Sequence, residues 1–327
     1  MQEHRLEIIL NPISKPLKIL LYLKPAIEIL ERAGYTVDIH KSVYFGDAEE
    51  EARRAARSGK YDLLVAAGGD GTYNQVINGI SGTDMPLALM PLGTSNVLMR
   101  SLKFPLNPVD AARVIVEGQL KKWDLGQING RYFAIMTSFG LDAYATEHTN
   151  LKLKRIIGKY AYIWSAVRNL TSYRPYPMSL TLDGHPTSYR PIFVNVANAP
   201  LYGGEYRLTP NARMDDGQLD VFIFDSRNIY RLLYFALRVI LKFPLNLPEI
   251  SIHRARRVEI TAPGRVPYQV DGDTMGNLPA QISIHPQAIR IITPKKFIRK
   301  HEELPALAIS GIRLVENLFG SKNRRRN

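Results

Sequence analysis

The feature that most constrains the fold of this chain is a regular alternation, in its first part, of short apolar runs with segments of helical periodicity. Strands are predicted from the apolar runs at residues 6–10, 35–40, 61–67 and 86–90. Helices are predicted at residues 17–33 and 47–57 and from Thr72 onward. Because strand–helix–strand units place their strands in parallel, we expect an N-terminal α/β domain with a doubly wound parallel sheet.

The pattern changes after about Trp123, where segments rich in β-branched and aromatic residues lie between Gly, Pro, Asn and Asp turn residues. Such a pattern is typical of an antiparallel sandwich or barrel, so we expect an all-β, sandwich-like C-terminal domain with inserted helices. Its strands are predicted at residues 131–139, 178–183, 190–197, 218–224, 258–261, 267–270 and 280–285.

The two inserted helices are predicted at residues 151–170 and 229–243, each with an apolar stripe and basic residues on another face. Two interpretations stay open. The stripe packs into the core and the basic face is solvated, or the basic amphipathic face lies on a membrane. In the second helix the stripe comprises Leu232, Leu233, Ala236, Val239, Ile240 and Phe243, with Arg231, Arg238 and Lys242 opposite.

Two glycine-rich turns follow strands of the first domain. The first comprises Gly68, Gly69, Asp70, Gly71 and Thr72, and the second is Pro91-Leu92-Gly93-Thr94-Ser95-Asn96. Glycine lets the backbone approach a ligand closely, and free N–H groups at a helix start favour an anion. Because ligands bind at the carboxyl ends of parallel strands, the two turns predict a phosphate or nucleotide site.

These turns do not match the common nucleotide motifs. The chain has no G-x-x-x-x-G-K-[ST] sequence, and Gly69-Asp70-Gly71-Thr72-Tyr73-Asn74 lacks the third glycine of the dinucleotide fingerprint. A Walker site is therefore unsupported and an NAD(P) dehydrogenase is disfavoured. Asp70 would repel phosphate unless a cation intervenes, which suggests magnesium.

Composition and charge narrow the function classes. The 327 residues include no cysteine, which excludes a disulfide framework, a thiolate nucleophile and a zinc–thiolate site. The formal charge of +13 suits nucleic acid, an anionic membrane surface or an acidic small substrate. Since no common nucleic-acid-binding motif, secretory signal or apolar run of about 18 residues is visible, we expect a cytoplasmic protein that binds no nucleic acid.

A series of short motifs carries a family resemblance through most of the chain. Around the first glycine-rich turn, Gly68 to Gly79 reads G-G-D-G-T-Y-N-Q-V-I-N-G, and Asn11-Pro12-Ile13-Ser14 precedes it. Later motifs are Asp124-Leu125-Gly126, Ser138-Phe139-Gly140-Leu141-Asp142-Ala143, Asn198-Ala199-Pro200-Leu201-Tyr202-Gly203-Gly204, Asp215-Asp216-Gly217-Gln218-Leu219-Asp220 and Gln269-Val270-Asp271-Gly272-Asp273. In this order they resemble the diacylglycerol kinase catalytic-domain family of bacterial lipid kinases, related to sphingosine kinases and more distantly to NAD kinases.

The resemblance implies roles for individual residues. Asp271 would be the general base that takes the proton of a lipid hydroxyl as its oxygen attacks the γ-phosphate of ATP. Asp216, with the carbonyls of Arg213 and Gln218, would bind a structural magnesium ion, and Asp70 and Asp124 would help to organise a magnesium-bound water. The ATP phosphates and ribose would be held by Gly68, Gly69, Asp70, Gly71, Thr72 and Asn74, with Asn11, Ser42, Gly93, Thr94 and Asn96 nearby.

The chain departs from the family pattern at four positions. Val97 stands where an acid usually joins the magnesium-bound water, Gln75 replaces a usual Glu, Asp273 is one methylene shorter than the usual Glu, and Lys15 replaces a usual Gly. Two alternatives to a lipid kinase therefore stay open. One is a NAD kinase, which shares the first glycine-rich turn, and the other is a nucleotide-binding regulator at the membrane surface that has lost turnover.

The sequence thus predicts an ATP- and magnesium-dependent kinase that phosphorylates a hydroxyl of diacylglycerol, a sphingoid base or another glycerolipid. A nucleotide domain is expected at residues 1–126, a lipid-substrate domain at 127–290, and a C-terminal segment at 291–327 that packs back on the first domain. Basic residues of that segment suggest peripheral contact with the anionic inner face of a membrane. They are Lys295, Lys296, Arg299, Lys300, Lys322, Arg324, Arg325 and Arg326. A homodimer is left open.

Overall fold

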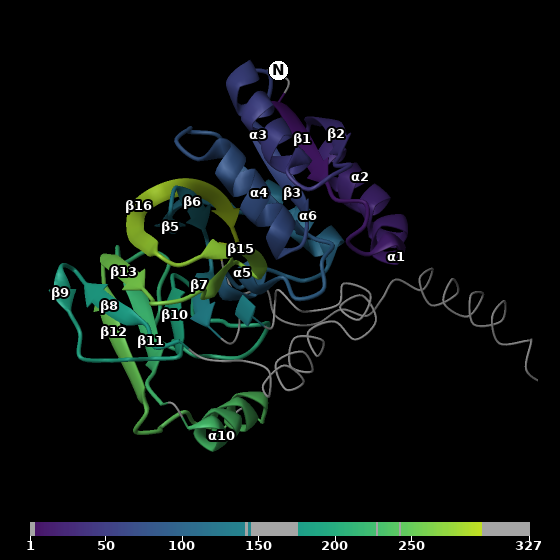
Figure 1. The fold of residues 1–327 in the computed structure, drawn as a ribbon. Helices are drawn as coiled ribbons and strands as arrows, with labels where there is room; N and C mark the ends of the chain where they lie inside the picture. The colour runs from purple at the N-terminus through teal and green to yellow at the C-terminus, as the bar shows by residue number, and fades with distance from the viewer. Residues whose placement is uncertain (1–3, 141–142, 145–175, 227, 242, 296–327) are drawn as a thin grey trace, which may run out of the picture. The chain divides into compact units, whose positions relative to one another are not determined.

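The computed structural model describes residues 4–140, 143–144, 176–226, 228–241 and 243–295 (Figure 1). The predicted helix at 151–170, Asp142 and Lys242 lie outside these residues. The predicted C-terminal segment lies outside them from residue 296 onward, together with most of its basic residues.

The first part of the chain forms the predicted parallel sheet. β1 (His4–Leu10) pairs in parallel with β2 (Tyr35–Lys41) and with β3 (Leu63–Gly68), and β3 pairs in parallel with β4 (Leu87–Pro91). Helices cover both faces, which explains why β3 is buried along its whole length. α3 (Asp47–Ser58) and α4 (Asp70–Ile80) pack on one face, and α2 (Lys24–Arg32) and α6 (Pro108–Glu117) pack on the other.

The helix predicted at residues 17–33 is a continuous helical run with a wider central turn. It consists of α1 (Pro16–Lys18), the π-helical turn η1 (Ile19–Leu23) and α2. Pro25 has no N–H for the carbonyl four residues earlier, so an unbroken α-helical ladder cannot form there. A short helix, α5 (Val97–Ser101), follows the second glycine-rich turn.

The second part of the chain is the predicted β sandwich. One of its layers is a six-stranded antiparallel sheet in the order β12-β11-β10-β7-β14-β15. These strands are β12 (Ile250–Ala255), β11 (Leu219–Phe224), β10 (Phe193–Ala197), β7 (Met136–Gly140), β14 (Pro267–Val270) and β15 (Asp273–Asn277). Its inner residues pack on those of the other layer, for example Phe139 and Val196 against Val258 and Ile282.

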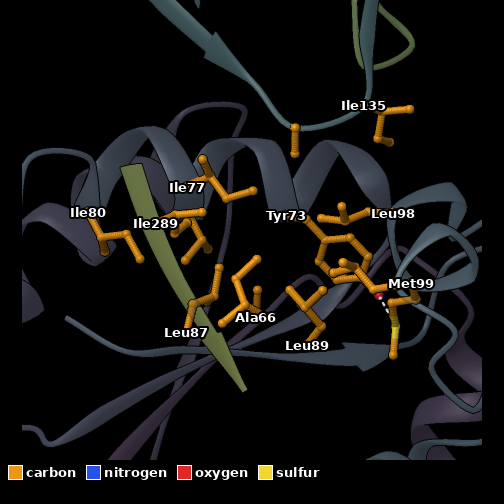
Figure 2. Packing of buried hydrophobic residues seen from close by; sticks show 14 of the residues in the cluster. Ala66, Tyr73, Ile77, Ile80, Leu87, Leu89, Leu98, Met99, Ile135 and Ile289 are labelled. Atoms are coloured by element: carbon orange, nitrogen blue, oxygen red, sulfur yellow. Dashed lines mark hydrogen bonds between the residues drawn. The ribbon is translucent and has the colours of Figure 1, made fainter. Parts of the chain in front are cut away.

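The other layer is continuous with the parallel sheet. Its strands are β5 (Gln119–Ile128), β6 (Arg131–Phe133), β8 (Ser179–Leu182), β9 (His185–Pro186), β13 (Arg257–Thr261) and β16 (Ala280–Thr293). β16 pairs in antiparallel with β13 and β5 and, at Ile291, in parallel with Leu87 of β4. Figure 2 shows the result, with Ile289 of β16 packed beside Ile77 of α4 and Leu87.

One further helix, α10 (Ile229–Ile240), packs on the six-stranded sheet. Leu232 and Phe235 are buried, and the ring of Phe235 lies 4.9 Å from that of Phe224 and 5.7 Å from that of Phe222. Among the described helices, none has the length and apolar character needed to cross a bilayer.

Candidate active site

The predicted nucleotide residues lie along one edge of the parallel sheet, where β1 to β4 end. Asn11 follows β1, Ser42 follows β2, Gly68 ends β3 and Gly93 lies just beyond β4. The amide of Asn11 donates to the hydroxyl of Thr72 at 3.3 Å, which joins the first of these strand ends to the third. The structure therefore brings the predicted residues together at the edge where open α/β sheets bind ligands.

The two glycine-rich turns lie directly against each other. The N–H of Gly93 donates to the carbonyl of Gly68 at 2.7 Å, and a Cβ on Gly69 would lie 3.2 Å from the Cα of Gly93. A side chain at either position would push the turns apart. The close approach places Gly93 beside Gly69, the residue before α4, and the exposed Thr94 follows Gly93 directly. Free N–H groups at such a helix start suit a phosphate chain.

Asp70, the first residue of α4, caps the following helix. Its carboxylate accepts hydrogen bonds from the N–H groups of Val97 and Leu98 at the start of α5, each at 3.0 Å. Burial raises the pKa of Asp70 to about 6, and the nearby carboxylate of Asp271 adds to the rise. Since each oxygen already accepts a backbone hydrogen bond, Asp70 holds α5, and with it the second glycine-rich turn, in place.

Three cations lie together near the second glycine-rich turn. The Lys18 ammonium donates to the carbonyl of Leu106 at 3.3 Å and to that of Pro91 at 3.5 Å. Burial lowers the pKa of Lys18, and the charges of Lys15 and Arg100 lower it further. An anion bound among these groups would relieve their mutual repulsion. Lys18 and Arg100 were not predicted from the sequence, because only the fold brings them to the turn.

Asp271 is buried at the turn between β14 and β15, where four N–H groups donate to its carboxylate. Oδ1 accepts from the N–H groups of Ile135 (2.9 Å) and Met136 (3.0 Å). Oδ2 accepts from the N–H of Ala134 and the amide of Asn74, both at 2.9 Å. Burial raises the pKa of Asp271, whereas these hydrogen bonds oppose the rise. The carboxylate thereby joins α4 to the chain between β6 and β7.

This contact explains why the strand predicted at residues 131–139 is interrupted. Residues 134 and 135 lie between β6 and β7, and their N–H groups point to Asp271 and not to a neighbouring strand. The backbone is thus drawn out of the sheet to surround a buried carboxylate.

Asn74 is fixed by a chain of polar side chains. Arg131 donates to Oδ1 of Asn74 at 2.8 Å and to Glu49 at 3.0 Å. Because Oδ1 is the acceptor, the amide nitrogen of Asn74 points to Asp271 and to the carbonyl of Tyr132, 3.0 Å away. The hydrogen-bonding groups of Asn74, predicted as a nucleotide ligand, are therefore engaged with protein groups.

Asp273 lies against the first glycine-rich turn. A Cβ on Gly71 would be 2.9 Å from Oδ2 of Asp273, so this half-buried carboxylate contacts the first turn of α4. Gly272, the residue before it, has a φ of +97°, a conformation that favours glycine and directs the chain from Asp271 to Asp273. Asp273 thus contacts the glycine-rich turn itself, whereas Asp271 contacts Asn74 further along α4.

The predicted metal ligands gather at one turn before β11. The carboxylate of Asp124 accepts from the N–H of Gly217 at 2.7 Å and from that of Gln287 at 2.8 Å. The N–H of Gln218 donates to Oδ1 of Asp216 at 3.2 Å, and Arg213 lies in the same turn. Asp124 therefore secures this turn through both of its oxygens.

Asp216 and Asp220 offer carboxylate oxygens, the kind of ligand that binds magnesium. Oδ2 of Asp216 and Oδ2 of Asp220 are buried and accept no hydrogen bond. Arg254 partly neutralises them, with its guanidinium 3.5 Å from Asp216 and 3.8 Å from Asp220. Within the described residues, no three His, Asp or Glu side chains are grouped so as to hold a metal ion. A magnesium ion here would therefore need carbonyl oxygens as well, such as those predicted for Arg213 and Gln218.

Besides Asp273, two further departures from the family pattern have defined contacts. Gln75 accepts a hydrogen bond from the N–H of Gly46 at 2.9 Å and so fixes the loop before α3. Val97 is buried in the apolar core, and its N–H binds Asp70. Both side chains therefore contribute to the structure around the site.

Comparison with known proteins gives matches to nearly the whole described chain. Residues 5–128 match the family model "Diacylglycerol kinase catalytic domain", and residues 135–293 match "YegS C-terminal NAD kinase beta sandwich-like domain". A diacylglycerol kinase of Bacillus subtilis is 30% identical over 295 residues, which cover 89% of this chain and 97% of that protein. A diacylglycerol kinase of Staphylococcus aureus is 31% identical over 317 residues, covering 96% and 98%.

Solved structures show the same fold. A crystal structure of a diacylglycerol kinase from Bacillus anthracis has a TM-score of 0.68 at 24% identity, covering 90% of this chain and 97% of that one. A second crystal structure from the same organism has a TM-score of 0.75 at 24% identity, covering 90% and 96%. These structures have the α/β part and the β sandwich described above.

Proposed function

Since this chain belongs to the diacylglycerol kinase catalytic-domain family and is a lipid kinase, we propose that it transfers the γ-phosphoryl group of ATP to the free hydroxyl of diacylglycerol. The relatives named diacylglycerol kinase, at 30% identity or more over most of the chain, favour this acceptor. A sphingoid base and other glycerolipids are the acceptors against which diacylglycerol has to be tested.

The observation that carries the proposal is the contact of the two glycine-rich turns at the carboxyl edge of the sheet, with a carboxylate against one and cations beside the other. We assign the ATP phosphates to the turn of Gly68 to Thr72 and to Thr94. Asn11 and Ser42 would bind at the rim of the same edge. Phosphoryl transfer needs mainly positioning and charge neutralisation, which N–H groups and cations provide.

For the general base we propose Asp273 in preference to Asp271. The carboxylate of Asp271 accepts four hydrogen bonds from protein groups. A protonated carboxyl could not accept all four, so taking up a proton would break part of this set. Asp273 contacts the turn assigned to the phosphates. A carboxylate there can accept the proton of the lipid hydroxyl as the new O–P bond forms and the bond to ADP breaks. Asp271 then acts as a positioning residue that holds α4 and the β15 turn together.

Magnesium is part of the proposal in two places. Asp216, with the carbonyls of Arg213 and Gln218, would hold a structural ion through its buried Oδ2, which accepts no hydrogen bond and lies 3.5 Å from the guanidinium of Arg254. A magnesium ion that arrives with ATP would neutralise charge on the phosphates during transfer. Lys18, Lys15 and Arg100 would add positive charge beside the phosphate chain.

The test is transfer of labelled phosphate from ATP to lipids in mixed micelles, with products identified by mass spectrometry. Diacylglycerol, a sphingoid base, a monoacylglycerol and NAD are compared as acceptors, with magnesium present or chelated. We expect magnesium-dependent phosphorylation of diacylglycerol above the others. Phosphorylation of NAD alone, or ATP binding without transfer to any lipid, would refute the proposal.

A further inference from the structure

α10 is apolar on two opposite sides, and this is unusual for a helix on the surface of a protein. Its inner side, with Leu232 and Phe235, packs on the phenylalanine rings of the six-stranded sheet. Its outer side carries Tyr230, Leu237 and Leu241, whose exposed fractions are 76%, 51% and 51%. A water-facing side normally carries polar residues, so we expect these exposed apolar residues to contact a partner.

The exposed residues form one continuous stripe. Tyr230, Tyr234, Leu237 and Leu241 are spaced by four, three and four residues, which places them on the same side of the helix. We refer to this stripe as the outer face of α10. Phe243, also exposed, follows it along the chain, and Figure 1 shows α10 beyond the ends of β11 and β12.

The surroundings of the outer face are basic. Residues 226–243, which include α10, contain Arg227, Arg231, Arg238 and Lys242 and no acid. Of these, Arg231 pairs with Glu249 at 3.3 Å. The guanidinium of Arg238 donates to the hydroxyl of Tyr234 at 2.7 Å and lies over its ring at 5.4 Å. Tyrosine rings with arginine beside them are typical of the headgroup level of a bilayer, where the ring is partly dry and the charge meets lipid phosphate.

A hollow beside the inner side of α10 lies near an element of the candidate active site. A hollow of about 560 Å³ is lined by Val239 of α10, Phe243, Ile252 and Glu205. Glu205 pairs with Arg100 at 3.4 Å, and Arg100 belongs to α5, the helix that begins at the second glycine-rich turn. The hollow next to α10 is thus connected to α5 through the ion pair between Glu205 and Arg100.

We propose that the outer face of α10 is a membrane-docking surface that inserts into the headgroup region of an anionic bilayer. The proposal rests on the proposed function in one respect, because a kinase of diacylglycerol must meet a substrate that stays in the bilayer. Aromatic and leucine side chains would insert, while the arginines bind anionic phosphate groups. A second copy of the chain is disfavoured as the occupant, since like charges would face each other across the contact.

The test measures insertion directly, without ATP or diacylglycerol, so its result does not depend on catalysis. A tryptophan is placed on the outer face by Leu237→Trp, and the matched control is Val116→Trp at an exposed apolar position of α6. Vesicles contain equal parts of phosphatidylcholine and phosphatidylglycerol, with brominated acyl chains as quenchers. We expect a blue shift and quenching for Leu237→Trp and no change for Val116→Trp.

A second experiment measures affinity. In the double variant Leu237→Glu/Leu241→Glu, two exposed leucines become acids, so the fold should survive, as unchanged melting temperature and ATP affinity would show. Vesicle binding by sedimentation should fall by about tenfold or more, whereas Val116→Glu should bind as the parent protein does. Binding should also require the anionic lipid and weaken as salt is raised.

Three results would overturn the proposal. They are absence of quenching in Leu237→Trp, unchanged vesicle binding in the double variant, and conversion of a parent dimer to a monomer by the double variant with vesicle binding intact. Vesicle binding that depends on the outer face, in a protein with no lipid kinase activity, would support the docking surface and refute the proposed function.

Discussion

Asp271 and Asp273 can be separated by replacing each with asparagine. Asparagine keeps the size of aspartate and tolerates the φ of +49° that Asp271 adopts, so Asp271→Asn removes the carboxylate and leaves the backbone as it is. Either orientation of the new amide directs its NH₂ group at two N–H donors. These are Ala134 and Asn74 on one side, or Ile135 and Met136 on the other.

The expected cost follows from those four contacts. A hydrogen bond to a charged acceptor contributes about 1.5–3 kcal/mol, so losing two of them costs about 3–6 kcal/mol. Because burial disfavours the charged form of Asp271, removal of the charge offsets part of that loss. We expect the free energy of unfolding to fall by about 2–4 kcal/mol, which is large beside the total stability of a typical domain.

Asp273→Asn should have the opposite profile. Asp273 is half-buried, and its replacement should change the free energy of unfolding by about 0.5 kcal/mol or less. Loss of a general base should lower kcat by about 10²–10⁴-fold. Thr274→Ala, at the exposed neighbouring position on β15, is the matched control and should change neither quantity.

The assay combines urea unfolding, followed by circular dichroism, with initial rates of labelled phosphate transfer at saturating ATP. Rates are compared under conditions where each variant is folded. The assignment is wrong if Asp271→Asn keeps its stability but loses turnover while Asp273→Asn remains active. In that case Asp271 would be the general base, and the four hydrogen bonds to its carboxylate would adjust its pKa for catalysis.

Three further perturbations test other parts of the structure. Lys18→Met removes one of three clustered cations, so ATP affinity in calorimetry should fall by about tenfold, and an unchanged affinity would exclude Lys18 from the phosphate site. Gly71→Ala puts a methyl group 2.9 Å from Asp273, so kcat should fall by about tenfold or more without a lower melting temperature, and an undiminished kcat would contradict that placement. Burial, with Glu51 beside it, raises the pKa of Glu7 to about 8. The folded protein therefore keeps a proton that the unfolded chain loses above about pH 4.5. The free energy of unfolding should fall as the pH rises toward 8, and Glu7→Gln should reduce that fall. If the free energies of unfolding of the parent protein and of Glu7→Gln fall in parallel with pH, Glu7 is not buried and protonated.

The elements with strong local periodicity could be predicted from the sequence. The alternation before Trp123 gives the parallel strands, and the strand ends followed by glycine give the edge where the candidate site residues lie together. The interruption of residues 131–139 could not be predicted, because the N–H groups of residues 134 and 135 bind a carboxylate 137 and 136 residues away. Nothing in the local pattern indicates such a contact.

The same limit applies to two other features. β16 was predicted to end at residue 285, but it continues to Thr293 because β5 and β4 supply its backbone partners. The predicted helix at 229–243 has the expected inner stripe in Leu232 and Val239. The exposure of its apolar outer face depends on which side of the helix packs on the sheet. Periodicity identifies a buried side but does not tell how much of the rest a fold leaves exposed.

The pairing of β16 with β4 has a consequence for synthesis of the chain on a ribosome. β4 emerges as residues 87–91, yet the strand that covers its open side comes about two hundred residues later. At a few to about twenty residues per second, that backbone edge waits for ten seconds or more without its native neighbour. Unpaired strand edges recruit other strands, so nascent chains stalled between these two points should be the species most prone to aggregate and most dependent on chaperones.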